Sequence, residues 1–583
     1  MEQEKIQKIR HSLAHLLGSA VLQIWPDAKI ATGPAIENGF YYDFDFTTPI
    51  VEKDLGKIEQ KMRETIKKWK SFEKSEISED DAKKLFSGNP YKLELIEEYA
   101  KDGQKLSTYT SGDFTDLCAG PHVENIDEIK NSAFKLERIA GAYWKGSEDN
   151  KMLTRVYGLA FATKEELSAY ELQQEEAKKR DHRKIGQDLK LFVFSDLIGK
   201  GLPTFGPKGA TIKRELERFT IDEEIKRGYH HVVTPDLAKV ELYKKSGHYP
   251  YYKDTMYPVM KIDEEELILK PMTCPHHFMF YKSEPHSYRD LPYRIGEIAH
   301  QYRYEKSGEL SGLTRVRMFC LADAHIISAK GEAKQVIKEV LELIDFINGT
   351  LGMVKGVDYR YRLSLGDRTD TEKYYKDDAS WEYAENILRE VLTDLNAPFY
   401  EASNEAAFYG PKIDIQVKKA SGKEETAFTV QYDFVMPDRF DLTFTNKEGK
   451  EEKPVVIHRS SIGCLERTMA FLIEKYMGAF PLWLSPVQVK VVPVRENHNE
   501  EAKKVADKLK EAGFRVDLDD KDGNMGGKVR DAKNNKIPYV VILGDKDISA
   551  KVITVENRDK GSLGQMSLEK FLEMIEEERK EKR

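Results

Sequence analysis

The most constraining feature of this chain is a segment in which arginines and a glutamate flank a polar loop. It runs Arg303-Tyr-Glu305, continues through a loop rich in polar residues and glycine, and resumes as Arg315-Val-Arg317-Met-Phe319. Arginine binds phosphate oxygens in a planar, bidentate manner, and its charge does not titrate away. The phenylalanine supplies a flat face for a base. We therefore expect two antiparallel strands and their turn to hold a nucleotide; a charged, solvated hairpin is the alternative.

Length and composition describe a globular protein of several domains. The chain has 583 residues, of which 40% are hydrophobic and 33% charged, and about three to five domains are expected at this length. The formal net charge is −8, so any surface for nucleic acid must be local. The longest apolar runs are far shorter than a membrane span, and the N-terminus has no apolar signal region. Four scattered cysteines suit a reducing compartment. We expect a cytoplasmic protein with no membrane segment.

Changes of pattern along the chain predict four regions. An α+β domain is expected over 1–165, a polar linker helix over 166–189, a large α+β domain over 190–482 and a small α/β domain over 483–583. The linker is polar all round, which is typical of a helix that bridges domains. In the last region strands alternate with helices, which predicts a largely parallel sheet.

Two further segments resemble signature motifs of the class II aminoacyl-tRNA synthetases. A helix over 211–227 leads into a strand that ends at Pro235, and this resembles motif 1, the dimer interface. The arginine segment, extended to Asp323, resembles motif 2. Gly463-Cys-Leu-Glu-Arg467 opens a helix and resembles motif 3. The order and spacing of all three place the chain in this class, which implies an antiparallel-sheet catalytic core and a homodimer.

The resemblance implies that a carboxylate attacks the α-phosphate of ATP and expels pyrophosphate. Such a reaction needs positioning and charge neutralisation more than proton transfer. Arg303 is expected to hold the α-phosphate and the amino-acid carboxylate, and Arg315 the γ-phosphate. Adenine is expected between Phe319 and Arg467, with Glu305 at its edge. Mg²⁺ would bridge the phosphates.

Three residues are candidate metal ligands, although their spacing contains no local zinc motif. Cys274, His325 and His458 are far apart in the chain, and each alone is compatible with an ordinary buried residue. The chain resembles the threonyl-tRNA synthetases, in which these positions bind a zinc ion with an open coordination place. The zinc takes the amino group and hydroxyl of L-threonine. A site that requires the hydroxyl rejects valine by ~10⁴–10⁵.

The same resemblance implies a pocket around the amino acid and shows where this chain departs from the family. Asp323 matches the residue that supports the threonine hydroxyl. Further pocket positions are matched by Tyr409, Lys412, Gln431 and Trp381. The usual family residues are replaced at His276, Met318, Leu321, Ala322 and Cys464. We expect these departures to affect substrate affinity or rate more than substrate identity.

A second candidate site lies in the first 165 residues. His11 and His15 fall at i, i+4 on one helical face, and Cys118 and His122 follow Asp116 closely. A surface pair is the alternative for His-x-x-x-His alone, and with Cys-x-x-x-His the spacing suggests a metal site. The set also resembles the editing domain of bacterial-type threonyl-tRNA synthetases.

That domain hydrolyses seryl-tRNA. Serine lacks only one methyl of threonine, which is worth ~1–3 kcal/mol and leaves discrimination incomplete. We favour a site without metal, in which an imidazole activates water, and Lys105 aligns with a lysine of that pocket. The small domain that usually precedes the editing domain is expected to be absent.

The last region resembles an anticodon-binding domain, which makes tRNA(Thr) the expected partner. The prediction for the whole chain is ATP-dependent activation of L-threonine, its transfer to tRNA(Thr), and hydrolysis of seryl-tRNA(Thr). The competing hypothesis is a non-catalytic, RNA-binding or regulatory paralogue. Such a protein would have lost motif arginines or zinc ligands, and this chain keeps them.

Overall fold

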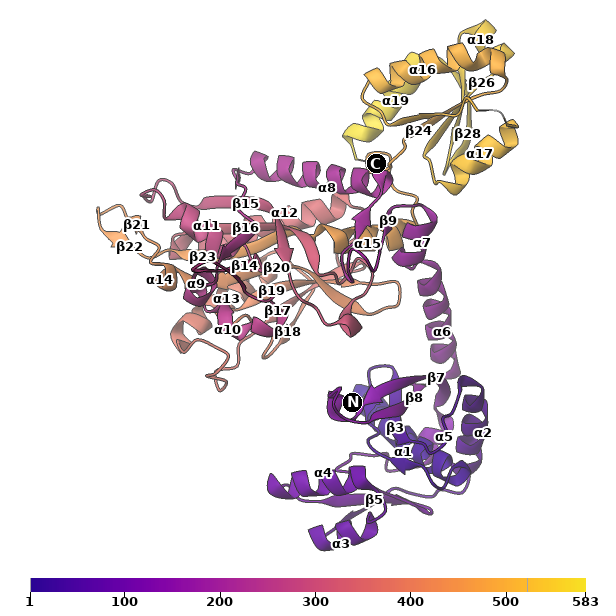
Figure 1. Ribbon diagram of the computed structural model, residues 1–583, viewed down its shortest axis with the longest axis vertical. Coiled ribbons are helices and arrows are strands. Elements are labelled where there is room, and N and C mark those ends of the chain that lie inside the picture. Colours follow the sequence, from indigo (N-terminus) through magenta and orange to yellow (C-terminus); the bar gives the residue numbers. More distant parts are fainter. Residues whose placement is uncertain (1, 522, 583) are drawn as a thin grey trace. The chain divides into compact units, whose positions relative to one another are not determined.

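The computed structural model describes residues 2–521 and 523–582 and divides the chain into two compact units (Figure 1). The first unit is Met1–Glu175 and the second is Glu176–Arg583. The division falls inside helix α6 (Lys164–Lys179), which has no buried side chain, as the polar linker pattern predicted. The limits of the four regions drawn from the sequence stay a prediction.

The first unit is an α+β domain in which a long N-terminal helix packs on a sheet. The sheet has the strand order β1-β3-β8-β7, with β2 paired to β3, and a separate antiparallel sheet has the order β4-β5-β6. Leu13, Leu16 and Leu17 of helix α1 are fully buried in its core, as their helical spacing predicts. The helices are α1 (Glu2–Ile24), α2 (Leu55–Thr65), α3 (Glu79–Leu85), α4 (Pro90–Lys101) and α5 (Asp127–Asn131). The strands are β1 (Lys29–Ile30), β2 (Ala35–Ile36), β3 (Gly39–Asp45), β4 (Glu73–Glu76), β5 (Ser107–Ser111), β6 (Phe114–Leu117), β7 (Ala133–Tyr143) and β8 (Met152–Phe161).

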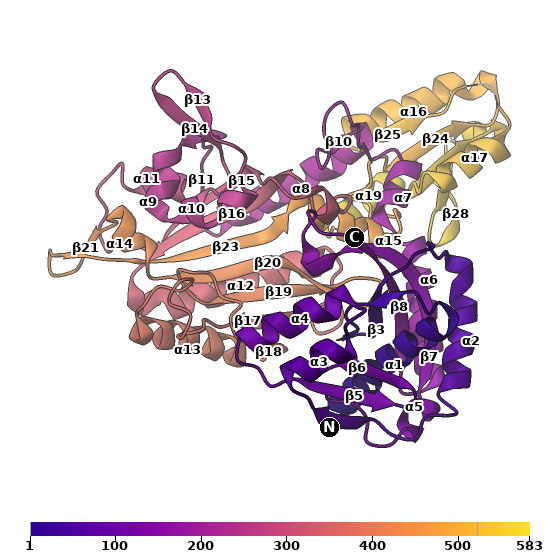
Figure 2. The same ribbon diagram turned by 60° about the horizontal axis from the view of Figure 1, so that its bottom comes forward.

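The second unit is built around an eight-stranded sheet with the order β11-β15-β16-β23-β20-β19-β17-β18. All neighbours are antiparallel except the outermost pairs β11/β15 and β17/β18, so the predicted antiparallel core is confirmed. Figure 2 shows β23, β20 and β19 side by side. The sheet strands are β11 (His230–His231), β15 (Tyr293–Tyr302), β16 (Met318–Ser328), β17 (Tyr359–Ser364), β18 (Phe399–Ala402), β19 (Lys412–Lys418), β20 (Glu424–Asp433) and β23 (Val455–Cys464).

Helices and small sheets complete this part of the second unit. Helix α12 packs on β23 and β20, and α13 packs on α12 and β19. The helices are α7 (His182–Asp188), α8 (Pro207–Lys226), α9 (Val240–Ser246), α10 (His248–Tyr251), α11 (Cys274–Tyr281), α12 (Ala333–Thr350), α13 (Asp378–Asp394), α14 (Met436–Phe440) and α15 (Leu465–Tyr476). The smaller strands are β9 (Phe192–Val193), β10 (Thr204–Phe205), β12 (Leu237–Lys239), β13 (Met260–Ile262), β14 (Glu265–Leu269), β21 (Phe444–Thr445) and β22 (Glu451–Glu452).

The C-terminal part has a five-stranded sheet with the order β25-β24-β26-β27-β28. The first three strands are parallel, as the alternating pattern predicted, whereas β27 and β28 are antiparallel additions that the sequence analysis missed. The connection through α18 is too short for the crossover of a dozen or more residues that a parallel pair needs. The elements are β24 (Val489–Pro493), α16 (Asn499–Glu511), β25 (Val516–Leu518), α17 (Met525–Asn534), β26 (Tyr539–Leu543), α18 (Asp545–Ala550), β27 (Ile553–Asn557), β28 (Gly561–Met566) and α19 (Leu568–Lys580).

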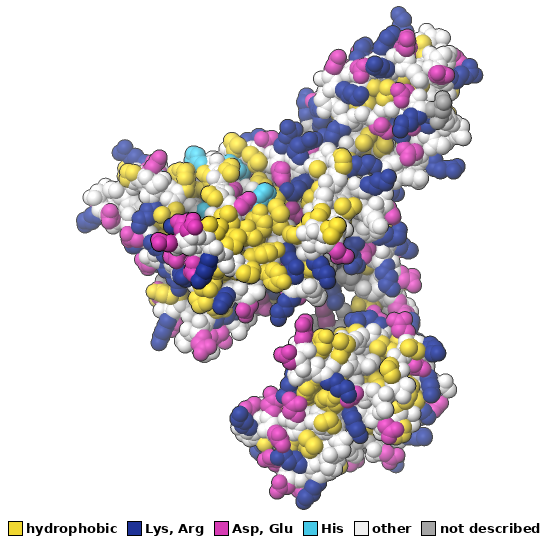
Figure 3. All heavy atoms as spheres, in the orientation of Figure 1, with side chains coloured by type: hydrophobic (Ala, Val, Ile, Leu, Met, Phe, Trp, Pro, Cys, Tyr) yellow, Lys and Arg dark blue, Asp and Glu magenta, His cyan; other side chains and the backbone are white. Residues whose placement is uncertain are grey.

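The surface shows no single dominant sign of charge. On the face drawn in Figure 3, basic and acidic side chains are interspersed, in keeping with a net charge of −8 for 583 residues. Within the described part of the chain, every helix is too short or too polar to cross a lipid bilayer.

Candidate active site

The candidate active site of the second unit is organised by a row of side chains that crosses four neighbouring strands. His325 of β16 is paired with His458 of β23, His458 with Gln431 of β20, and Gln431 with Lys412 of β19. Paired residues of neighbouring strands project from the same face of a sheet. Strand register therefore gathers residues that the sequence keeps far apart.

A single cleft of about 690 Å³ collects the predicted residues. Phe319, Asp323 and His325 alternate along β16, so all three point to the cleft face. The predicted residues that line it are Cys274, Arg303, Glu305, Arg315, Phe319, Asp323, His325, Tyr409, Lys412, Gln431, His458 and Arg467. Trp381 is not among them. It is buried near Tyr374, and its indole N–H donates to the Tyr375 carbonyl.

Cys274, His325 and His458 form what we call the cleft cluster. Their candidate ligand atoms lie within 4.8 Å of one another, and all three residues are buried. Cys274 is the first residue of α11, and the histidines face each other across β16 and β23. A thiol and two imidazoles are a donor set that zinc prefers, and three protein ligands leave one position open. The residues present therefore fit a zinc ion.

Both histidines of the cleft cluster are held through one ring nitrogen. His458 Nε2 lies 2.7 Å from Asp433 Oδ2, and His325 Nδ1 lies 2.8 Å from His277 Nδ1. Each ring therefore keeps its second nitrogen for another partner. Such outer contacts are typical of metal-binding histidines, because they fix the tautomer and the orientation of the ring.

The motif arginines lie in the same cleft with different degrees of engagement. Arg303 is partly exposed, and the burial of its guanidinium group lowers its pKa. Its buried Nε has no hydrogen-bond partner. Its guanidinium carbon lies 5.3 Å from the centre of the Phe319 ring. Arg315 Nε forms an ion pair of 3.1 Å with Glu305. Arg467 donates to the carbonyls of Thr314 and Thr426. A buried guanidinium with an unused donor is suited to an anionic ligand.

Motif 3 depends on a close approach that only glycine permits. Gly463 has φ of +77°, and a Cβ there would lie 2.5 Å from the Ala427 carbonyl oxygen. The next residue but one begins α15, from which Arg467 reaches the cleft. The predicted role of this glycine in close packing agrees with this geometry.

The polar pocket residues are tied into hydrogen bonds. The Tyr409 hydroxyl donates to Gln431 Oε1 at 2.5 Å, and Tyr409 stacks on His458. Lys412 Nζ lies 3.0 Å and 2.9 Å from the two carboxylate oxygens of Asp414. Asp323 accepts a hydrogen bond of 3.1 Å from Gln301, and burial raises its pKa. Asp323 therefore lies in the cleft beside the cleft cluster, 4.0 Å from His325 Nε2.

The cleft also contains polar residues that the sequence analysis missed. They include His248, Tyr252, Gln301 and Arg459. Gln301 lies two residues before Arg303, on the same strand face by the alternation rule, so its position was a usable signal. His248 carries no such signal, because helix α10, which it begins, reaches the cleft only through the tertiary fold.

Of the five atypical residues, two line the cleft, whereas His276, Met318 and Ala322 do not. Leu321 and Cys464 are register partners and both line it. Ala322 is buried and outside the cleft lining, as the alternation along β16 requires. His276 packs near Tyr243. Leu321 therefore contributes an apolar side chain to the wall of the cleft.

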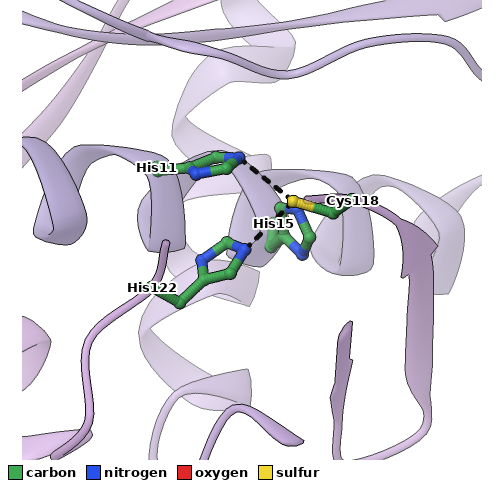
Figure 4. Close-up of side chains that lie close together, drawn as sticks. All are labelled: His11, His15, Cys118 and His122. Atoms are coloured by element: carbon green, nitrogen blue, oxygen red, sulfur yellow. Dashed lines mark hydrogen bonds between the residues drawn. The ribbon is translucent and has the colours of Figure 1, made fainter. Parts of the chain in front are cut away.

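In the first unit, His11, His15, Cys118 and His122 form what we call the N-terminal cluster (Figure 4). Cys118 Sγ lies 3.4 Å from Nε2 of both His11 and His122. His11 Nδ1 donates to the Pro121 carbonyl at 3.1 Å. The candidate ligand atoms of all four residues lie within 4.8 Å of one another. The predicted four residues are therefore brought together.

A buried ion pair supports the N-terminal cluster from behind. Lys92 of α4 lies 2.5 Å from Asp116 Oδ1, and both side chains are almost fully buried. The Tyr42 hydroxyl donates to the other Asp116 oxygen. Lys105, by contrast, is 87% exposed and lies 4.0 Å from Glu76. The lysine beside this cluster is therefore Lys92, which the sequence analysis missed because α4 carries no motif.

Burial keeps the N-terminal cluster uncharged at neutral pH. It lowers the pKa of His11 and His122, and lowers that of His15 well below its usual value. It also raises the pKa of Cys118 to about 11. A neutral imidazole that is only half-buried, as in His11, can accept a proton from water.

Three family models match successive parts of the chain. Residues 257–476 match the tRNA synthetase class II core domain (G, H, P, S and T), and residues 488–578 match an anticodon binding domain. Residues 106–157 match the Threonyl and Alanyl tRNA synthetase second additional domain. The first match contains most of the cleft residues, and the third contains Cys118 and His122.

Characterised relatives are similar over almost the whole chain. The Threonine--tRNA ligase of Geobacillus sp. (strain WCH70) is 48% identical over 99% of this chain and 89% of its own length. The Staphylococcus carnosus (strain TM300) enzyme of the same name is 48% identical over 97% of this chain and 87% of its own length.

Solved structures agree with these relatives. The RNA binding domain of threonyl-tRNA synthetase from Cryptosporidium parvum Iowa II has a TM-score of 0.64 at 32% identity, covering 68% of this chain and 98% of that one. A putative threonyl-tRNA synthetase, ThrRS-1, from Aeropyrum pernix has a TM-score of 0.63 at 29% identity, covering 69% and 96%. With its class II sheet, its cleft and these full-length relatives, the chain belongs to the threonine--tRNA ligase family.

Proposed function

We propose that the chain activates L-threonine with ATP in the cleft of the second unit and transfers it to tRNA(Thr). The observation that carries the proposal is the single cleft of about 690 Å³ that holds the cleft cluster together with Arg303, Arg315 and Arg467. Amino-acid selection and phosphate binding would then occur side by side, as adenylate formation requires.

The arginines supply charge neutralisation for this reaction. Arg303, whose buried Nε has no hydrogen-bond partner, would bind the α-phosphate and the threonine carboxylate. Arg315, whose side chain is half exposed, would exchange part of its contact with Glu305 for the γ-phosphate. Phe319 and Arg467 would enclose adenine, and Mg²⁺ would accompany ATP at the phosphates.

Cys274, His325 and His458 would hold a zinc ion that binds the amino group and hydroxyl of threonine. Asp323 and the Tyr409–Gln431 pair would orient the hydroxyl and amino groups from the protein side. Valine offers no hydroxyl, so its rejection by ~10⁴–10⁵ is expected.

The N-terminal cluster would hydrolyse seryl-tRNA(Thr) without a metal. His11 Nε2 and His122 Nε2 both face Cys118, and both rings stay neutral at pH 7. One of them would accept the proton of the attacking water, and Asp116 with Lys92 would position the helix face on which His15 lies.

A homodimer through the catalytic part and tRNA binding by the C-terminal part complete the proposal. Large apolar side chains are exposed in the second unit at Val193, Leu197 and Val233, the last within the motif-1-like segment. In Figure 3 hydrophobic side chains gather over this part of the molecule. Exposed apolar patches of this kind mark interfaces.

Threonine-dependent ATP–pyrophosphate exchange tests the first activity. Zinc-loaded protein should catalyse exchange with threonine and not with valine. A chain that shows no exchange with any amino acid would contradict the proposal and favour a non-catalytic paralogue. Release of serine from preformed seryl-tRNA(Thr) tests the second activity separately.

A further inference from the structure

A chain of buried hydrogen bonds runs from the cleft cluster away from the cleft. His325 Nδ1 lies 2.8 Å from His277 Nδ1, and His277 Nε2 lies 3.2 Å from Glu297 Oε2. All three side chains are buried. His277 lies one turn after Cys274 on α11, so one short helix supplies both a candidate ligand and this second histidine.

The negative charge of Glu297 determines which atom donates in each of these hydrogen bonds. A carboxylate only accepts hydrogen bonds, so His277 must donate from Nε2. A neutral His277 then has its lone pair at Nδ1 and accepts the Nδ1–H of His325. This leaves the lone pair of His325 on Nε2, the nitrogen that remains for a metal ion.

Other groups hold Glu297 in the ionised form. Its two oxygens accept hydrogen bonds from the Thr234 amide (3.0 Å) and the Thr234 hydroxyl (2.8 Å), and Lys270 Nζ lies at 3.4 Å. Burial by itself would raise the pKa of Glu297. The bonds from His277 and Thr234 and the charge of Lys270 outweigh it, and the pKa is about 2.

We propose that Glu297 and His277 are positioning residues that fix the tautomer of His325 and thereby set the affinity of the chain for zinc. The proposal rests on the zinc site proposed above. It adds two residues that touch neither zinc nor threonine and act only through His325.

The substitution Glu297→Gln distinguishes this role from simple packing. In the wild type, Glu297 Oε1 faces the Thr234 amide and the Lys270 ammonium group, which can only donate hydrogen bonds. The side-chain oxygen of the glutamine must therefore occupy the position of Oε1. Its NH₂ group then faces His277 Nε2 and must donate to it. His277 would then adopt the opposite tautomer and donate from Nδ1 to His325 Nδ1. The proton of His325 would move to Nε2 as a result. A nearly isosteric change would thus block the metal-binding nitrogen.

The experiment uses the full-length protein and measures zinc affinity by competition with a chromophoric chelator. We expect Glu297→Gln and His277→Phe to bind zinc about 10–100-fold more weakly than wild type. With Co²⁺ in place of zinc, the intensity of the d–d absorption bands should fall at equal metal loading. Glu385→Gln, which changes a buried carboxylate paired with Arg368 outside the cleft lining, is the matched control and should leave affinity unchanged.

Thr234→Val provides a milder variant in case removing a buried partner unfolds the domain. It deletes one hydroxyl donor and keeps the backbone amide, so a smaller loss of affinity is expected with a native circular dichroism spectrum. If the wild type binds zinc and Glu297→Gln, His277→Phe and Thr234→Val all bind it with wild-type affinity, the positioning role is overturned and the zinc site stands. A wild-type chain that takes up no zinc would overturn the zinc site and this role together.

Discussion

The cleft cluster and the N-terminal cluster are built from the same kinds of side chain and differ in what surrounds them. The histidines of the cleft cluster are backed by Asp433 directly and by Glu297 through His277. The N-terminal cluster has one nearby carboxylate, Asp116, and Lys92 neutralises it. Anionic surroundings favour a divalent cation, whereas a neutralised carboxylate does not add to that attraction.

The contacts between members of each cluster also favour metal binding in the cleft cluster over the N-terminal cluster. In the N-terminal cluster, Cys118 Sγ already contacts the Nε2 atoms of two histidines. In the cleft cluster, His325 contacts His277 and His458 contacts Asp433 through hydrogen bonds that point away from Cys274. A cysteine and two histidines in proximity therefore do not by themselves define a metal site; the outer partners decide.

The largest expected effect is the loss of amino-acid activation when a ligand of the cleft cluster is removed. Cys274→Ala should lower threonine-dependent ATP–pyrophosphate exchange by about 10⁴-fold, because the hydroxyl-recognising metal would be lost. Metal analysis of the purified variant should find no zinc. Retention of both zinc and exchange would contradict the assignment of Cys274.

A second substitution tests the opposite cluster. Cys118→Ala should slow hydrolysis of seryl-tRNA(Thr) by about 10²–10⁴-fold, since the general-base arrangement would be disrupted. Its exchange activity and zinc content should equal those of wild type.

Treatment of the wild type with a strong chelator should stop ATP–pyrophosphate exchange and leave the hydrolysis of seryl-tRNA(Thr) unchanged. If hydrolysis also stops and added zinc restores it, the N-terminal cluster uses metal.

The buried ion pair of the N-terminal cluster predicts a change in stability. Lys92→Met should destabilise the first unit by about 3 kcal/mol, because Asp116 would be left buried and unpaired. Lys105→Met should have little effect, since that side chain is 87% exposed. Hydrogen exchange of α1 peptides in the full chain measures both, and equal protection in the two variants would argue against the buried pair.

The stability of the first unit is also expected to depend on pH. Burial depresses the pKa of three histidines below the usual 6.5 in the folded state. Below about pH 6.5 the unfolded chain therefore binds protons that the folded chain does not, and stability falls by at most about 1.4 kcal/mol per pH unit for each histidine.

The cysteine of the same cluster limits stability at the alkaline end. The pKa of Cys118 is raised from 9.0 to about 11, so the unfolded chain loses its proton first as the pH rises above 9. Hydrogen exchange of α1 should therefore show greatest protection between about pH 6.5 and 9. Unchanged protection at pH 5 would show that the histidines are not buried as neutral groups.

Much of the architecture could be predicted from the chain alone. Helical periodicity predicted α1, and a glycine before a helix predicted motif 3. Both patterns are formed by residues close together in the sequence, so they can be read without the tertiary structure. The antiparallel core followed from the motif resemblance. The edge hairpin β27–β28 was missed: β27 alternates buried and half-buried residues over only five positions, and β28 contains two glycines and no buried side chain.

The sequence by itself determined which residue types are available for chemistry: the motif arginines, the Cys274–His325–His458 set and the histidine pair of α1. Only the tertiary structure decided their surroundings, because strand register and helix packing join residues that have no sequence relation. It brought Lys92 to the N-terminal cluster and left Lys105 outside it, and it enclosed Trp381 away from the cleft. It also placed Glu297 and His277 behind His325. Hydrogen bonds and burial act over distances in space, and spacing along the chain does not encode those distances.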